Sequence, residues 1–139
     1  MVFAAREVMT PAPVALPADT PLTEAARRMR DQGIGTVLVH DDHQLCGLIT
    51  DRDIVVRAMA AEKSSAATTL GAICTSRLVT VGPDDTVSAA VRLMRANAVR
   101  RIPVVENGRA IGIISLGDLA IKRAQSSPLA DVSGAPPTG

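Results

Sequence analysis

Two hydroxyl residues are each followed, three positions later, by an aspartate: Thr50 by Asp53, and Ser115 by Asp118. A hydroxyl at the start of a helix leaves backbone N–H groups at the positive end of the helix dipole, which favours an anion. A carboxylate in the first helical turn can accept two hydrogen bonds, which suits the vicinal diol of a sugar. The spacing therefore indicates two candidate sites for a sugar phosphate.

Glycine and arginine residues accompany both motifs. Gly47 and Gly112 lie three positions before the hydroxyls and remove side-chain bulk where a ligand could approach the backbone. Arginine supplies a planar, permanently charged fork for phosphate. The candidates are Arg100 and Arg101 before the second motif, and Arg52 beside the first, which also fits a solvent-exposed helix position.

The same spacing allows an interpretation that needs no ligand. A hydroxyl residue three positions before an acidic one, ahead of an apolar helix, is also typical of a capping box. Such a cap contributes about 1 kcal/mol of stability. Both interpretations stay open here, and the binding interpretation fails if Asp53 and Asp118 are closed in hydrogen-bond loops of their own.

The two motifs belong to an internal duplication with an offset of 65 residues, the spacing of Gly47 and Gly112. The register continues without gaps over residues 8–55 and includes identical pairs such as Met29 and Met94. The chain is therefore predicted to fold as two similar halves.

Each half is predicted to contain strand, helix, strand, strand and helix in that order. In the first half, Thr20 is expected to cap a helix with Pro21 at its first position, and Gly33 is expected to end it. The expected strands are 14–16, 36–39 and 45–49, before a helix from Thr50 that turns Ile54, Val55 and Ala58 inward. In the second half the expected strands are 79–81, 102–105 and 110–114, with helices over 87–94 and from Leu116.

The organisation along the chain follows from this pattern. Residues 1–62 form the first repeat with an N-terminal segment, 63–69 a polar linker, 70–125 the second repeat, and 126–139 a flexible tail rich in Pro, Ser and Gly. A lone repeat buries too little surface to be comfortably stable. The halves are therefore expected to pack through strands 36–39 and 102–105, with clefts along the seam.

The composition excludes several classes of protein. The 139 residues include one aromatic side chain, Phe3, and carry a formal net charge of +1, which argues against nucleic-acid binding. No apolar run is long enough for a membrane span or a signal peptide, so a cytoplasmic protein without a membrane partner is expected. No nucleophile triad, P-loop or dinucleotide fingerprint is present, so we predict no catalytic residues and no enzyme.

His40, His43 and Cys46 together could suggest a metal cluster. The repeat register argues otherwise, because Cys46 and Cys74 align with apolar residues of the other repeat. We therefore predict no metal site and two reduced thiols in core positions.

The segments 47–53 and 112–118 both fit Gly-x-x-Ser/Thr-x-x-Asp and resemble the signature at the end of a cystathionine-β-synthase (CBS) repeat. The run 99–105 resembles the central strand entry of that family, and the resemblance covers about residues 5–123. It implies an α/β (α+β) fold of two βαββα-type repeats around a pseudo-two-fold axis. It also implies clefts that take AMP, ADP, ATP or a related adenosyl ligand.

By the same resemblance, the two aspartates would bind ribose hydroxyls, the hydroxyl residues ribose or phosphate, and the arginines phosphate. The backbone of Ile102 and Pro103 would line the base. The first repeat has Gly35 and Thr36 in place of the two arginines, so the second site is expected to bind more strongly. The predicted ligand-binding set is Gly47, Thr50, Arg52, Asp53, Arg100, Arg101, Ile102, Pro103, Gly112, Ser115 and Asp118.

The function expected from this resemblance is regulatory: a sensor of adenine nucleotide, with Mg²⁺ as an optional companion, that acts in trans on a protein effector. A homodimer is implied, with the helix faces 22–29 and 87–94 as candidate contacts. The alternative is a ligand-free structural or adaptor protein that binds another protein.

Overall fold

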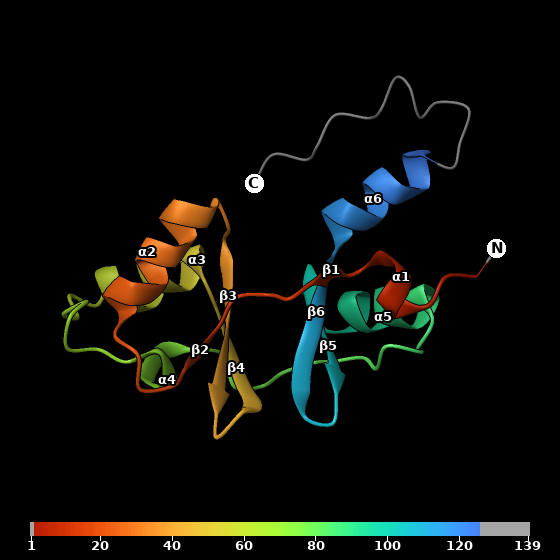
Figure 1. The fold of residues 1–139 in the computed structure, drawn as a ribbon. Coiled ribbons are helices and arrows are strands. Elements are labelled where there is room, and N and C mark those ends of the chain that lie inside the picture. Colours follow the sequence, from red (N-terminus) through yellow and green to blue (C-terminus); the bar gives the residue numbers. More distant parts are fainter. Residues whose placement is uncertain (1, 126–139) are drawn as a thin grey trace. The chain divides into compact units, whose positions relative to one another are not determined.

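The computed structural model describes residues 2–125, the last five through their backbone alone. The predicted flexible tail, 126–139, lies outside the described residues. The chain divides into two compact units (Figure 1). We call residues 13–78 the repeat-1 unit, and residues 1–12 together with 79–139 the repeat-2 unit. Each is described by itself.

The repeat-1 unit is built on a three-stranded sheet in the order β2-β3-β4. Strand β2 (Ala15–Pro17) is parallel to β3 (Thr36–Asp41), and β3 is antiparallel to β4 (Gln44–Thr50). Helix α2 (Leu22–Gln32) connects β2 to β3 and ends at Gly33, which has a φ of 63° and accepts the left-handed conformation without a Cβ penalty. The predicted strands and the helix end are confirmed.

The start of α2 differs from the prediction. Pro21 is the N-cap residue, no side chain caps the helix, and Thr20 does not act as the cap. The first N–H groups donate to the linker instead: Leu22 to the Thr68 carbonyl at 2.9 Å and Thr23 to the Ser65 carbonyl at 3.2 Å. Backbone carbonyls of the linker therefore satisfy the donors that a capping side chain would otherwise take.

A short helix α3 (Asp51–Asp53) continues directly into a π-helix, η1 (Ile54–Met59), and helix α4 (Leu70–Ile73) follows the linker. Ala58 is buried and Ile54 packs against the core, as predicted. The prediction that Val55 points inward is wrong, because Val55 is 52% exposed. The wider π-helical turn changes which residues share a face.

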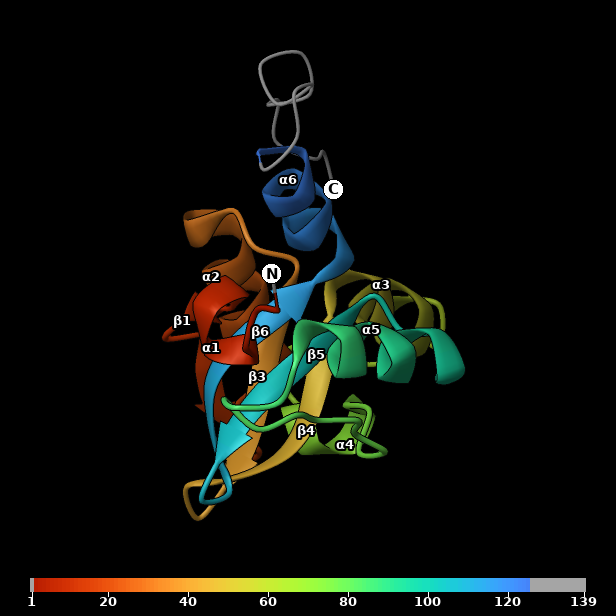
Figure 2. The ribbon, with the colours of Figure 1, turned by 90° about the vertical axis from the view of Figure 1, so that its right-hand side faces the viewer.

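The repeat-2 unit has the same plan, with sheet order β1-β6-β5. Helix α5 (Val87–Ala96) precedes β5 (Arg101–Glu106), which is antiparallel to β6 (Arg109–Ser115), and α6 (Leu116–Gln125) follows at once. The predicted strand 79–81 is reduced to a single parallel bridge between Val81 and Val104. Figure 2 shows α5 beside the β5–β6 ribbon.

The N-terminal segment, residues 1–12, belongs to the repeat-2 unit. Helix α1 (Ala5–Val8) packs against α5, and β1 (Thr10–Pro11) pairs with β6 (Figure 2). In the repeat-1 unit the equivalent segment is α4 and the residue Thr75, which bridges to Leu48 of β4. Each repeat is therefore completed by the segment that precedes the other repeat in the sequence.

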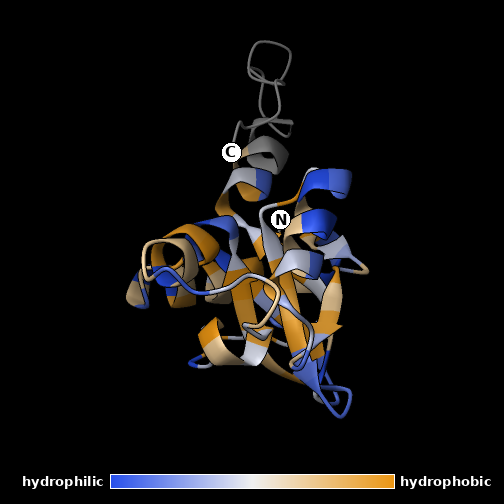
Figure 3. Ribbon diagram, turned by 90° about the vertical axis from the view of Figure 1, so that its left-hand side faces the viewer, coloured by the Kyte–Doolittle hydropathy of each residue, from blue (hydrophilic) through white to orange (hydrophobic). Residues whose placement is uncertain are grey.

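Each unit has its own apolar core between sheet and helices. Leu22, Ala25 and Met29 of α2 are buried in the first core, and Ala90 and Met94 of α5 in the second. These helix faces are therefore not available as the predicted dimer contacts. Figure 3 shows the mostly apolar strands and the hydrophilic turn at the end of a hairpin. None of the helices within residues 2–125 is long and apolar enough to cross a membrane.

Candidate functional site

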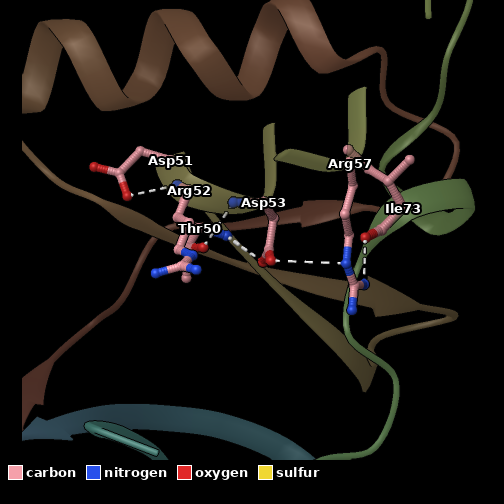
Figure 4. A network of polar contacts seen from close by, with 6 residues as sticks. All are labelled: Thr50, Asp51, Arg52, Asp53, Arg57 and Ile73. Carbon is pink, nitrogen blue, oxygen red and sulfur yellow. Dashed lines mark hydrogen bonds and ion pairs between the residues drawn. The ribbon is translucent and has the colours of Figure 1, made fainter. Parts of the chain in front are cut away.

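The motif of the repeat-1 unit forms a complete capping box at the junction of β4 and α3 (Figure 4). The Asp53 N–H donates to Thr50 Oγ1 at 3.1 Å, and the Thr50 N–H donates to Asp53 Oδ2 at 2.9 Å. The local sequence favours this loop, because a short hydroxyl side chain and an acidic side chain three residues later reach each other's backbone. Thr50 and Asp53 are thus a structural cap.

Further contacts close the same helix start. The Asp51 N–H donates to the Gly35 carbonyl at 3.0 Å, and the Arg52 N–H to Asp51 Oδ1 at 2.8 Å. Arg57 lies with its Nε 3.9 Å from Asp53 Oδ1 and donates from Nη1 to the Ile73 carbonyl at 3.1 Å (Figure 4). The arginine therefore links the capping aspartate to helix α4.

The motif of the repeat-2 unit is only half closed. The Asp118 N–H donates to Ser115 Oγ at 3.1 Å, which caps α6. The reciprocal bond is not formed, and the exposed Asp118 carboxylate has no partner among side chains of residues 2–120. Leu116 N–H donates to the Arg100 carbonyl at 3.0 Å, while within those residues the Gly117 N–H has no acceptor. This helix start keeps both an acceptor and a donor available.

The arginines lie close to this open start. Arg101 is the cross-strand partner of Ser115, so their side chains emerge on the same face of the β5–β6 pair. Neither Arg101, which is half-buried, nor the exposed Arg100 forms an ion pair within residues 2–120. At the place of Arg101, the repeat-1 unit has Thr36, whose buried Oγ1 lacks a partner among the described residues. Arg52 is exposed, as its alternative interpretation predicted.

Ile102 and Pro103 contribute little side-chain surface. Both are fully buried in β5, and Ile102 belongs to the core of its unit. The Pro103 carbonyl accepts the Val81 N–H at 3.1 Å. Any contact of these two residues with a ligand base would have to avoid that occupied carbonyl.

The two glycines have a packing role that requires no ligand. A Cβ on Gly112 would lie 2.7 Å from Met9 Cγ, and one on Gly47 would lie 3.1 Å from Cys74 Cβ and collide with the sulfur of that residue. Met9 and Cys74 belong to the segments that complete each sheet. These glycines therefore admit the segment that precedes the other repeat, a constraint that the sequence alone did not reveal.

The comparisons with known proteins agree with this duplicated architecture. The sequence profile of the CBS domain matches residues 5–59 and 70–124. The chain belongs to the CBS domain family. CBS pairs are regulatory modules, and both matches coincide with the two repeats.

Individual relatives cover most of the chain. Protein YlbB of Bacillus subtilis is 36% identical over 116 residues, which are 79% of this chain and 78% of that protein. Hypoxic response protein 1 of Mycobacterium tuberculosis is 32% identical over 84% of this chain and 82% of its own. Its crystal structure with two coordinated zinc ions has a TM-score of 0.77 at 31% identity, over 85% of this chain and 97% of that one.

A third neighbour is the CBS domain pair of protein MJ0100, in complex with 5′-methylthioadenosine and S-adenosyl-L-methionine. It is 25% identical, with a TM-score of 0.76 over 85% of this chain and 97% of that one. Its ligands share an adenosyl group, which is the chemical class that the signature residues of the CBS repeats implied.

In this CBS pair the cysteines and histidines are placed outside the motifs. Cys46 and Cys74 are half-buried free thiols that pack against the first core, as predicted. Burial raises the pKa of both thiols. The imidazoles of His40 and His43 stack with centroids 6.1 Å apart. Among the described residues, no group of three or more His, Cys, Asp or Glu side chains is placed to hold a metal ion.

Proposed function

We propose that the repeat-2 unit binds an adenine nucleotide or a related adenosyl ligand and that the chain acts as a regulatory sensor. The observation that carries the proposal is the exposed Asp118 carboxylate, which the cap of α6 does not use. A free carboxylate at this position accepts hydrogen bonds from both hydroxyls of a ribose. This assignment involves no catalytic step.

The neighbouring groups fit the phosphate of such a ligand. The Gly117 N–H points from the start of a ten-residue helix and has no acceptor within residues 2–120. A helix start is a favourable place for an anion, and the guanidinium of Arg101 emerges beside Ser115. Arg100, which also forms no ion pair within residues 2–120, adds a second positive charge next to it. The adenosyl ligands of the MJ0100 pair support the same ligand class.

A homodimer that signals to an effector in trans belongs to the same proposal, with revised contacts. Val55, Val56 and Met59 of η1 are 52%, 54% and 68% exposed, and they replace the buried faces of α2 and α5 as candidates. Large apolar side chains gathered on one exposed element are typical of an interaction surface. Light scattering of the wild type and of Val56→Glu should show whether a dimer exists and whether it depends on this helix.

Isothermal titration with AMP, ADP, ATP and S-adenosylmethionine, each with and without Mg²⁺, tests the ligand. At a ligand concentration of one hundred times the Kd, the stability gain is about 2.7 kcal/mol. Asp118→Asn should weaken binding because it removes one of the two acceptors for the ribose hydroxyls, and Arg101→Gln because it removes a positive charge that faces the phosphate. Glu106→Gln, an exposed carboxylate at the far end of β5, is the matched control and should bind normally.

Two outcomes would contradict the proposal. If none of these ligands binds the wild type, the chain is better described as an adaptor that works through its exposed apolar residues. If a ligand binds but Asp118→Asn and Arg101→Gln bind it as the wild type does, the site lies elsewhere.

A further inference from the structure

We infer that the motif of the repeat-1 unit is a closed cap that excludes anions, and that Asp51 is the residue that closes it. Together with the proposed function, on which this part rests, the chain then holds one phosphate-bearing ligand rather than two. The sequence shows two copies of the motif. The two copies differ in the hydrogen bonds that their backbone N–H groups and carboxylates make.

Every N–H group at the repeat-1 helix start is already used. From Thr50 to Asp53 the four donors bond to Asp53 Oδ2, the Gly35 carbonyl, Asp51 Oδ1 and Thr50 Oγ1, at 2.9, 3.0, 2.8 and 3.1 Å. A phosphate would have to replace these acceptors before it could bind. The third bond depends on the Asp51 carboxylate, because the equivalent residue of the repeat-2 unit is Leu116, whose side chain has no acceptor atom.

The acceptor that would hold a ribose is committed as well. The Asp53 side chain is 19% exposed, with Oδ2 on the Thr50 N–H and Oδ1 near Arg57. The Asp118 carboxylate is exposed and makes neither kind of contact among the described side chains. A sugar hydroxyl could reach Asp53 only by opening the capping box.

The local charges point the same way. Asp51 and Asp53 place two carboxylates in the first turn of the repeat-1 helix, and the strand entry opposite carries Gly35 and Thr36. The repeat-2 start has the single carboxylate of Asp118 and two guanidinium groups, those of Arg100 and Arg101. Arg52 and Arg57 offset the two carboxylates of the first start, whereas the second start has one more positive than negative side chain among the described residues. A phosphate is therefore attracted more strongly at the second start than at the first.

Amide-resolved NMR of the whole chain tests this inference in two steps. In the free protein, hydrogen exchange should show high protection for the Arg52 amide and low protection for the Gly117 amide, after correction for intrinsic rates. Titration with ADP should then shift the amide resonances of Gly117 and Asp118 and leave those of residues 50–53 unchanged. The stoichiometry should be one ADP per chain. Equal protection of Arg52 and Gly117, or two binding events in the wild type, would overturn the inference.

Mutations that swap Asp51 and Leu116 between the two motifs provide a reciprocal test. Leu116→Asp supplies the missing acceptor and a negative charge, and should weaken ADP binding about tenfold. Leu116 is 37% exposed and an acidic residue suits the first turn of a helix, so folding should be retained; Leu116→Ala is the control that should bind normally. Asp51→Leu should remove the protection of the Arg52 amide.

The two proposals fail in different ways. If no amide resonance shifts on addition of ADP, the proposed ligand is wrong. The difference in hydrogen-exchange protection between the Arg52 and Gly117 amides still decides whether the cap is closed. If ADP binds and Leu116→Asp binds it as tightly as Leu116→Ala does, Asp51 is not the determinant of the difference.

Discussion

Asp53 and Asp118 occupy the same position in the two repeats and have different surroundings. Asp53 accepts a backbone N–H and lies near Arg57, whereas Asp118 is exposed, donates its N–H to Ser115 Oγ, and has no carboxylate partner within residues 2–120. Asp51 contributes to this contrast, since its counterpart in the other motif is Leu116; the counterpart of Arg57 is Lys122, whose side chain lies outside the described ones. Identity of a motif residue is therefore a poor guide to its availability.

The two thiols allow a test of residue environment. Burial raises the pKa of Cys46 and Cys74 above the ordinary value of 9.0, so less thiolate is present at neutral pH. Alkylation by iodoacetamide should be slow at pH 7 and should keep accelerating above pH 9. Because the unfolded thiols ionise first, stability should fall as the pH rises through that range. A reaction as fast in the native protein as in urea would contradict the assignment.

At the scale of elements, the segment before each repeat completes the sheet of the other. Met9 lies over Gly112, and Cys74 lies over Gly47, at positions related by the repeat offset. The close approach explains why glycine occurs at these two strand positions. The N-terminal segment, for which no helix or strand was predicted, forms α1 and β1.

Gly112→Ala should destabilise the protein by about 1–3 kcal/mol, because the new methyl group would lie 2.7 Å from Met9 Cγ and 2.9 Å from Met9 Cβ. Urea denaturation measures the change. Gly82→Ala is the matched control, since its Cβ would lie 3.6 Å from Asp85 Oδ2 in ordinary contact. A double-mutant cycle with Met9→Ala should show strong coupling, and additive effects would argue against this contact.

At the scale of the whole molecule, the order of segments along the chain differs from their grouping in space. Residues 1–12 belong to the unit of the second repeat, where Ala5 is fully buried and β1 extends the sheet beside β6. Strand β6 leads directly into Ser115 and the open helix start. The N-terminal segment thus supports a candidate site about one hundred residues away in the sequence.

Deletion of residues 2–11 should lower the melting temperature and reduce hydrogen-exchange protection in β6 and α5, because the deletion removes a strand and buried apolar contacts. Protection in β3 and β4 should change less. Arg6→Ala, which removes only the exposed ion pair with Asp84 at 2.9 Å, is the control and should cost less than about 1 kcal/mol. Equal loss of protection in both sheets would contradict the grouping.

The sequence by itself determined the duplication, the order of the main strands and helices, the end of α2 at Gly33 and the CBS family. These features depend on local periodicity, on capping and turn residues, and on a gapless repeat register, all of which can be recognised in the sequence without knowledge of tertiary contacts. The sequence also identified Ser115 and Asp118 and proposed both of their possible roles. It could not choose between binding and capping for either motif.

The tertiary structure decided what depends on contacts between distant residues. It closed the Thr50 and Asp53 box, placed Arg57 between Asp53 and Ile73, and assigned Met9 and Cys74 to glycines of the opposite repeats. It also showed that Val55 is exposed to solvent on a π-helix, which the local sequence pattern did not predict. Hydrogen-bond partners and close packing are properties of the folded chain, and equal motifs acquire unequal roles when their neighbours differ.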